Sequence, residues 1–177
     1  MLLPKQCVSF RGLVRQGFTP GEITSMNASL KLFPTPFKGI YYVPLEEERR
    51  GAFIEKPVNA LSQAIALYLG TREFYYSCKT AEEALGLSWQ ASGEIHVVNA
   101  KASKKVDLGE RMGRRKRRGT WRAKKIAKIL SFYGTRIIFH KSAFMAKAGT
   151  RETPYGRFAQ KQQIARDWKR FHCRKAK

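Results

Sequence analysis

The most regular pattern of apolar and polar positions lies in residues 59–99. Leu61, Ile65 and Leu69 recur at the spacing of one helical face, and Gly70 follows them as a residue suited to end a helix. Residues 73–76, of which the last three are aromatic, predict a strand, and the apolar run within residues 94–99 predicts a second strand with at least one covered face.

A short helix is expected between these two strands. Thr80 and Glu83 have the spacing of a capping box, in which the threonine hydroxyl accepts from the Glu83 amide and the carboxylate reaches back. The helix is expected to end near Gly86 and Leu87. Helix, strand, helix and strand in about forty residues predict the core of a small α/β or α+β domain.

Residues 1–45 predict a small module of two helices followed by two strands. The first helix is expected at Ser9–Arg15. Thr19, Pro20 and Glu22 then supply the N-cap, the first-turn proline and the acidic third position that begin a second helix. Strands are expected at residues 30–33 and 39–43, joined by residues 34–38.

This order of elements is that of a small, degenerate winged helix, in which the second helix enters the major groove of DNA. The possible base-reading residues are then Thr24, Ser25, Asn27 and Lys31. The possible wing contacts to phosphate are Lys38 and Tyr41. The alternative is a packing or dimerisation unit, because the second helix is short and contains no arginine.

The expected domain boundary is the charged segment 46–52, which is interpreted as an exposed linker. A compact mixed α/β domain is expected at residues 53–146, with a basic loop at 100–120. A basic C-terminal helix and tail are expected at residues 147–177. The predicted fold class is therefore α+β.

Several elements are expected after residue 120. The apolar stripe within residues 121–133 favours a helix, with a strand as the alternative. Residues 136–140 predict a strand and residues 148–154 a loop. Residues 156–173 predict a helix, because Ile164, Trp168 and Phe171 share one face.

The net charge of +22 is concentrated after residue 100. Residues 1–100 carry a net charge of only +1, residues 101–128 carry +11 and residues 147–177 carry +8. An acidic polymer is the natural partner of such a surface. Nucleic acid is favoured over an anionic membrane because no basic helix has a clear apolar face.

Residues 114–118 would form a mobile loop in the free protein, because like charges repel one another. A solvated charge run is the alternative.

The residues expected to contact nucleic acid are the basic residues of this half. They are Lys101, Lys104, Lys105, Arg111, Arg114, Arg115, Lys116, Arg117, Arg118, Arg122, Lys124, Lys125, Lys128, Arg157, Lys161, Lys169 and Arg170.

Four segments between residues 39 and 99, roughly the middle third of the chain, resemble the AbiEi family of antitoxins from type IV toxin–antitoxin systems. They are Gly39–Pro44 as the wing strand, Leu61–Leu69 as a helix rich in Ala and Leu, Phe74–Leu87 as a strand and helix, and Ile95–Asn99 as the following strand. The resemblance implies an N-terminal winged helix, an α/β C-terminal domain, repression of the protein's own operon, and opposition to a nucleotidyltransferase-type toxin. The arginine-rich segment and the basic C-terminal helix depart from the family pattern.

The sequence predicts no catalytic, cofactor or metal site. Two aspartates occur against eleven glutamates, and no clustered carboxylates suggest a Mg²⁺ site. His96, His140 and His172 are dispersed, and no cysteine lies at zinc-finger spacing from them, so zinc is not expected. Cys78 is interpreted as a small buried apolar residue, and His96 as a half-buried structural one. The odd number of widely separated cysteines favours reduced thiols in a cytoplasm.

The expected function is therefore non-enzymatic nucleic-acid binding in the cytoplasm, most specifically as a DNA-binding antitoxin and transcriptional regulator. RNA is a possible target instead of DNA, and a structural RNA-binding or ribosome-associated protein is the alternative. A metal-dependent nuclease is the third hypothesis, and it requires carboxylates distant in sequence to converge.

Overall fold

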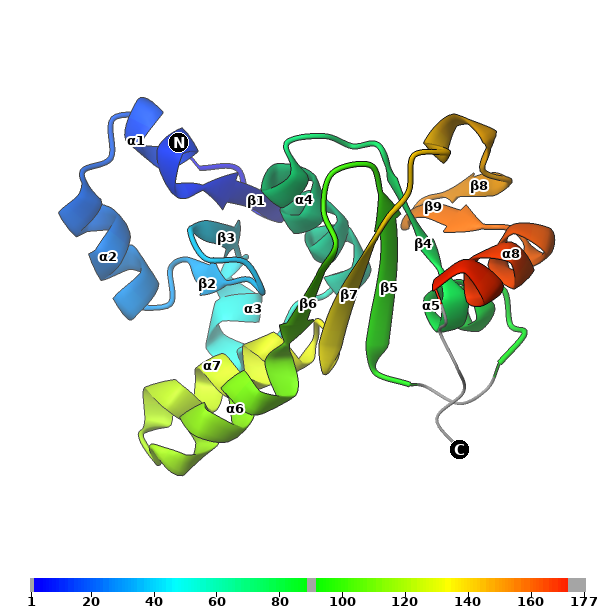
Figure 1. Ribbon diagram of the computed structural model, residues 1–177. Coiled ribbons are helices and arrows are strands. Elements are labelled where there is room, and N and C mark those ends of the chain that lie inside the picture. Colours follow the sequence, from blue (N-terminus) through cyan, green and yellow to red (C-terminus); the bar gives the residue numbers. More distant parts are fainter. Residues whose placement is uncertain (1, 89–91, 172–177) are drawn as a thin grey trace. The chain divides into compact units, whose positions relative to one another are not determined.

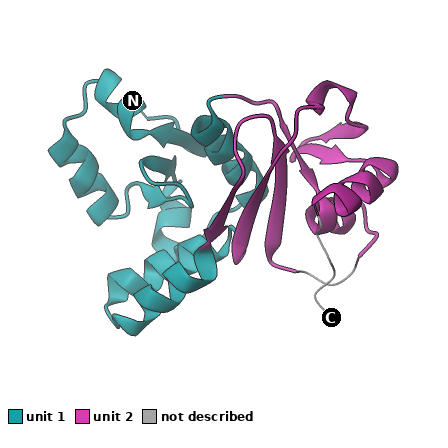
Figure 2. Cartoon of the chain, in the orientation of Figure 1, with its two compact units in different colours: residues 1–70, 108–133 teal, residues 71–107, 134–177 magenta. Residues whose placement is uncertain are grey.

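The computed structural model describes residues 2–88 and 92–171, and Figure 1 shows their helices and strands. The fold is mixed α+β, as expected. The chain divides into two compact units, which Figure 2 distinguishes by colour. Unit 1 comprises residues 1–70 and 108–133, and unit 2 comprises residues 71–107 and 134–177. This division differs from the expected domain boundaries, because residues 108–133 belong with the N-terminal part of the chain.

Unit 1 contains a small antiparallel sheet. Its strands are β1 (Gln6–Ser9), β2 (Phe33–Pro34) and β3 (Ile40–Val43), in the order β1-β3-β2. Strand β3 was expected, whereas β1 was not, and β2 is shorter than residues 30–33 and begins later.

Unit 1 also contains six helices. They are α1 (Phe10–Arg15), α2 (Pro20–Ala28), α3 (Glu46–Gly51), α4 (Pro57–Leu69), α6 (Leu108–Arg117) and α7 (Trp121–Ser131). Helix α2 begins with the predicted capping box, because the Thr19 side chain accepts from the Glu22 amide and the Glu22 carboxylate accepts from the Thr19 amide. Helix α4 ends at Gly70, which has a left-handed φ of 63°.

The packing of unit 1 explains why these elements form one body. A buried apolar cluster contains Leu13 of α1, Ile23 of α2, Leu32 just before β2, and Val43 of β3. Helix α4 packs on β1 and β3, helix α7 packs on β2, and α6 and α7 lie side by side.

Residues 46–52 do not form the expected exposed linker. Residues 46–51 are helix α3, and the side chain of Glu48 is buried. Its carboxylate accepts hydrogen bonds from the Tyr42 hydroxyl at 2.9 Å, the Leu45 amide at 2.8 Å and the Glu55 amide at 2.8 Å. This segment is therefore part of the core of unit 1, because the buried carboxylate connects β3 to the chain on both sides of α3.

Unit 2 is built on a six-stranded mixed sheet. Its strands are β4 (Phe74–Ser77), β5 (Glu94–Asn99), β6 (Lys104–Asp107), β7 (Arg136–Lys141), β8 (Thr150–Thr153) and β9 (Gly156–Ala159). Their order is β6-β7-β5-β4-β9-β8. β5 pairs with β7, and β4 with β9, in parallel, whereas the other pairs are antiparallel. The expected strands at residues 73–76, 94–99 and 136–140 are confirmed within one residue or so of their predicted bounds.

Helices α5 (Cys78–Ala84) and α8 (Lys161–Phe171) pack against each other and against the middle strands of this sheet. A 3₁₀ turn, η1 (Met145–Lys147), precedes β8. Asp167 of α8 is buried and accepts from Ser77 Oγ at 2.6 Å, Tyr75 Oη at 3.1 Å and Gln163 Nε2 at 2.8 Å. One carboxylate thereby fixes α8 to β4.

Several expectations for this half are wrong. The segment 100–120 is not a loop, since it contains β6 and α6. Residues 148–154 contain strand β8, and residues 156–159 form β9, so the C-terminal helix begins only at Lys161. The Thr80 capping box does not form, because α5 already begins at Cys78. The Thr80 hydroxyl instead donates to Glu94 O and accepts from the His96 amide, which joins α5 to β5.

Candidate nucleic-acid interface

Four arginines form one face of helix α6. Arg111, Arg114, Arg115 and Arg118 follow the spacing i, i+3, i+4, i+7, which places their side chains in one stripe from α6 into the turn that follows it. We call this stripe the arginine face. Its last residues lie at the C-terminal end of the helix, where positive charge is favoured by the helix dipole. The sequence analysis predicted that these arginines contact nucleic acid, but it placed them on a loop.

The arginine face borders a cavity of about 470 Å³ within unit 1. The other side of the cavity is formed by the end of α2, by β2 and β3, and by the loop that joins these two strands. The lining residues are Asn27, Pro34, Thr35, Phe37, Lys38, Gly39, Ile40, Tyr41, Arg111, Arg114, Arg115, Arg118 and Leu130. No carboxylate occurs among these lining residues, so the cavity is an electropositive concave surface.

The wall opposite the arginine face is held in a defined conformation. The Thr35 hydroxyl contacts Phe37 O and Ile40 O at 3.2 and 2.9 Å, within hydrogen-bonding distance of both. The Phe37 ring stacks on Tyr68 of α4 with a centroid distance of 4.6 Å. Arg111 donates to Pro36 O at 2.7 Å and therefore ties α6 to this loop.

The arginines are close enough to influence one another. Desolvation by burial, followed by the charges of Arg118, Arg122 and Arg111, lowers the pKa of Arg115 below its usual range. Guanidinium groups remain protonated at neutral pH, so their mutual repulsion persists. Glu110 lies 3.4 Å from Arg114 in an exposed ion pair, which offsets this repulsion only slightly. A bound polyanion would relieve it.

The possible base-reading residues do not all reach this cavity. Asn27 lines it, and its backbone oxygen accepts from Arg122 at 3.4 Å. The Thr24 hydroxyl instead donates to Pro20 O at 2.9 Å within its own helix. Ser25 and Lys31 are exposed and are not among the lining residues. The two possible wing residues, Lys38 and Tyr41, both line the cavity.

The remaining basic residues of unit 1 lie outside the cavity lining. Lys116, Arg117 and Lys124 are exposed. Lys125 lies 4.0 Å from the ring centroid of Trp121, in a cation–π contact. Lys128 donates to Gly51 O at 2.9 Å and connects α7 to α3. Lys125 and Lys128, which were predicted to contact nucleic acid, therefore both make contacts within unit 1.

The other predicted basic residues belong to unit 2. Lys104 and Lys105 are exposed on β6, an edge strand of the sheet, where lysines discourage further strand pairing. Arg157 donates to Thr150 Oγ1 at 2.5 Å across the β8–β9 pair. Arg170 donates to Ser142 Oγ at 3.0 Å and lies over the ring of Phe144. Lys101, Lys161 and Lys169 are exposed.

Sequence reasoning missed a second group of side chains, which lies in unit 2. Cys78, His96 and His140 are separated by up to 62 positions in sequence, yet each contributes a potential ligand atom to one cluster. These atoms all lie within 4.8 Å of one another. The expectation that the histidines are dispersed is wrong for His96 and His140, whereas His172 and Cys173 lie outside the described residues.

Comparisons with known proteins add nothing to this geometry. The chain matches no protein-family profile, no curated protein and no solved structure. Within residues 2–88 and 92–171, no helix combines the length and apolar character needed to cross a bilayer.

Proposed function

We propose that this chain is a non-enzymatic nucleic-acid-binding protein that holds a phosphate backbone against the arginine face of α6. The observation that carries the proposal is the cavity of unit 1, where four arginines stand opposite Lys38, Tyr41 and Asn27 without a carboxylate among the lining residues. Arginine is suited to phosphate because its planar guanidinium donates two parallel hydrogen bonds. A concave cationic surface also concentrates the field toward an approaching polyanion.

DNA is the favoured ligand. Helices α1 and α2, followed by β2 and β3, have the element order of a small winged helix, and Lys38 lies in the loop between these strands. On this proposal Lys38 and Tyr41 contact the backbone beside the arginine face, and Asn27 is the residue nearest to a base-reading position. Thr24, Ser25 and Lys31 would contact the duplex only beyond the cavity.

The resemblance to AbiEi antitoxins gives this proposal a biological setting. An antitoxin of this kind is a cytoplasmic regulator that represses its own operon and opposes a nucleotidyltransferase-type toxin. If the resemblance extends to function, the partner is a toxin of that chemistry, and co-purification with the product of a neighbouring gene tests this step separately from nucleic-acid binding.

A structural RNA-binding protein is the second candidate. A duplex would reach a cavity of about 470 Å³ only with its phosphates, at the rim, whereas a base splayed out of a folded RNA could enter it. Tyr41 and the guanidinium planes would then stack on the base. This proposal uses the same residues and differs only in the ligand.

Competition binding decides between these ligands. The affinity of the full-length protein would be measured by fluorescence anisotropy for duplex DNA and for an RNA hairpin of equal charge, over a salt series. We expect a steep fall in affinity with salt for either ligand and tighter binding of the duplex. A consistent preference for the hairpin would support the RNA alternative.

A triple variant tests whether the arginine face is the site. In Arg114→Gln/Arg115→Gln/Arg118→Gln, the slope of log K against log salt should shrink by about 2.7, at about 0.9 per lost phosphate contact. The matched control is Lys147→Gln/Arg151→Gln/Arg166→Gln, which removes the same charge from exposed positions of unit 2. An equal loss of slope in both variants would show that binding follows net charge, and the proposed site would be wrong.

A further inference from the structure

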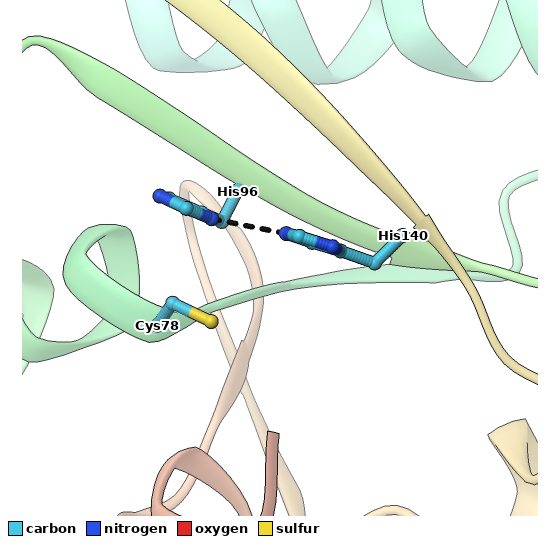
Figure 3. A group of neighbouring side chains, drawn as sticks. All are labelled: Cys78, His96 and His140. Atoms are coloured by element: carbon cyan, nitrogen blue, oxygen red, sulfur yellow. Dashed lines mark hydrogen bonds between the residues drawn. The ribbon is translucent and has the colours of Figure 1, made fainter. Parts of the chain in front are cut away.

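We infer that unit 2 holds a zinc ion between Cys78, His96 and His140. The three residues come from neighbouring parts of one sheet: Cys78 follows β4, His96 lies in β5 and His140 lies in β7. Because these strands are adjacent in the order β7-β5-β4, they bring the three side chains to one place. Figure 3 shows the Cys78 side chain beside the two imidazole rings, and a dashed line joins one nitrogen of His96 to one of His140.

The distances fit a zinc site after small side-chain movements. His96 Nδ1 and His140 Nε2 are 3.0 Å apart, and the three potential ligand atoms lie within 4.8 Å of one another. Ligand atoms around a tetrahedral zinc ion are roughly 3.3–3.7 Å apart, given bonds of about 2.0–2.3 Å. The two nitrogens, which share a hydrogen bond in this structure, must therefore separate slightly while the sulfur moves closer.

The backbone at Cys78 is unusual and places the thiol at the start of α5. Its φ is +51°, a left-handed conformation that non-glycine residues rarely adopt. Such backbone strain persists where the surrounding structure requires a particular side-chain position. Cys78 is fully buried and His96 is 4% exposed, so both ligands are shielded from water.

Neighbouring residues supply the support that metal-binding histidines require. If His96 binds through Nδ1, its remaining N–H lies on Nε2, and that atom is 3.7 Å from Glu94 Oε2. This distance is too long for a hydrogen bond, so Glu94 would act through its negative charge, which favours a metal-bound, cationic imidazole. The Phe171 ring stacks on His140 with a centroid distance of 4.5 Å and covers the other histidine.

One thiolate and two imidazoles define the class of metal. Zinc accepts this combination of sulfur and nitrogen ligands, whereas Mg²⁺ and Ca²⁺ require oxygen ligands. Three protein ligands leave a fourth position for water. Because the ion would join the start of α5 to β5 and β7, we assign it a stabilising role in unit 2. This inference is independent of the nucleic-acid interface, which lies in unit 1.

The test is metal binding by the full-length protein after treatment with a chelator. Competition with a chromophoric chelator should give one Zn²⁺ per chain, and added Zn²⁺ should raise the melting temperature. Co²⁺ should produce a thiolate-to-cobalt charge-transfer band. The absence of stoichiometric Zn²⁺ binding, or a Co²⁺ complex without this band, would overturn the inference even if no variant can be purified.

Two variants and a control identify the ligands. Cys78→Ser should abolish the charge-transfer band and weaken Zn²⁺ binding by more than 100-fold, whereas Glu94→Gln should weaken it by less than about 10-fold. The control Cys7→Ser removes a thiol from unit 1 and should leave both measurements unchanged. Unchanged Zn²⁺ affinity in folded Cys78→Ser, or loss of the band in Cys7→Ser, would exclude the proposed site.

Discussion

The guanidinium of Arg111 donates a hydrogen bond of 2.7 Å to the carbonyl oxygen of Pro36. This bond joins residues 75 positions apart and connects the first arginine of α6 to the loop between β2 and β3. Arg111 is therefore both part of the arginine face and a structural element of unit 1. The other arginines of that face have no such bond to this loop among the described hydrogen bonds.

This difference predicts separate effects on stability. Arg111→Ala should lower the free energy of unfolding by about 1 kcal/mol, because it removes a charge-assisted hydrogen bond and leaves the Pro36 carbonyl unsatisfied. The control Arg114→Ala breaks only an exposed ion pair with Glu110 and should change stability by less than about 0.5 kcal/mol. Chemical denaturation followed by circular dichroism measures both. Equal stability of the two variants would show that the Arg111 bond does not anchor α6.

The elements that sequence reasoning found are those with local signals. Helix α2 carries its cap, proline and acidic residue within four positions, and α4 has an apolar stripe that ends at a glycine. Helix α6 was missed because residues 114–118 are five consecutive basic residues, whose like charges repel one another and disfavour a helix in the isolated segment. Packing of α6 on α7 and burial of Leu108 outweigh this repulsion in the folded chain.

The candidate sites depend on contacts that spacing along the chain does not reveal. β9 pairs with β4 through Tyr76 and Phe158, which are far apart in sequence, so no hairpin signal indicates this pair. His96 and His140 approach each other only because β5 and β7 are parallel neighbours with these residues two positions out of register. The sequence therefore predicted the chemistry of the basic surface but neither its helical form nor the Cys–His–His cluster.

Lys38 provides a test of the wing contact. If its ammonium group neutralises one phosphate, Lys38→Ala should reduce the slope of log K against log salt by about 0.9 for duplex DNA. Lys56→Ala is the matched control, because Lys56 is also an exposed lysine of unit 1 but does not line the cavity. Anisotropy titrations at several salt concentrations measure both slopes. An equal change in Lys56→Ala would show that Lys38 makes no specific phosphate contact.

Cys7 should make the stability of the protein depend on alkaline pH. Burial raises the pKa of its thiol from 9.0 to about 12, and its sulfur donates to Ala60 O at 3.2 Å. Above pH 9 the unfolded chain loses this proton while the folded chain retains it, so stability is complete below pH 9 and falls as pH rises toward 12.

The measurement compares the wild type with Cys7→Ala. Between about pH 8 and about pH 10, the wild type should lose about 1.4 kcal/mol more unfolding free energy than the variant. Tyrosine residues contribute equally to both proteins in this range and cancel in the difference. Urea denaturation at each pH gives the values, and parallel pH profiles would mean that the Cys7 thiol ionises as easily in the folded protein as in the unfolded chain.

Gly134 should be intolerant of any side chain, because two independent restraints meet there. Its φ is +82°, and an added Cβ would lie 2.6 Å from the carbonyl oxygen of Gly93. That oxygen already accepts from the Thr135 amide at 2.7 Å, so it is held in place at the point where β5 and β7 begin. Gly134→Ala should therefore destabilise the protein by about 2–4 kcal/mol.

Gly86→Ala separates the two restraints. Gly86 also has a positive φ, of 69°, but an added Cβ meets no atom within 4 Å, so only the conformational cost of about 1 kcal/mol remains. Thermal and urea denaturation of both variants give the comparison. The same experiment bears on the proposed zinc site, since Gly134 precedes the strand that carries His140. If the clash displaces β7 from its register with β5, Gly134→Ala should also weaken Zn²⁺ binding, whereas Gly86→Ala should leave it unchanged. Equal destabilisation by the two alanines would show that backbone conformation alone, and not the approach of Gly93, selects glycine at this turn.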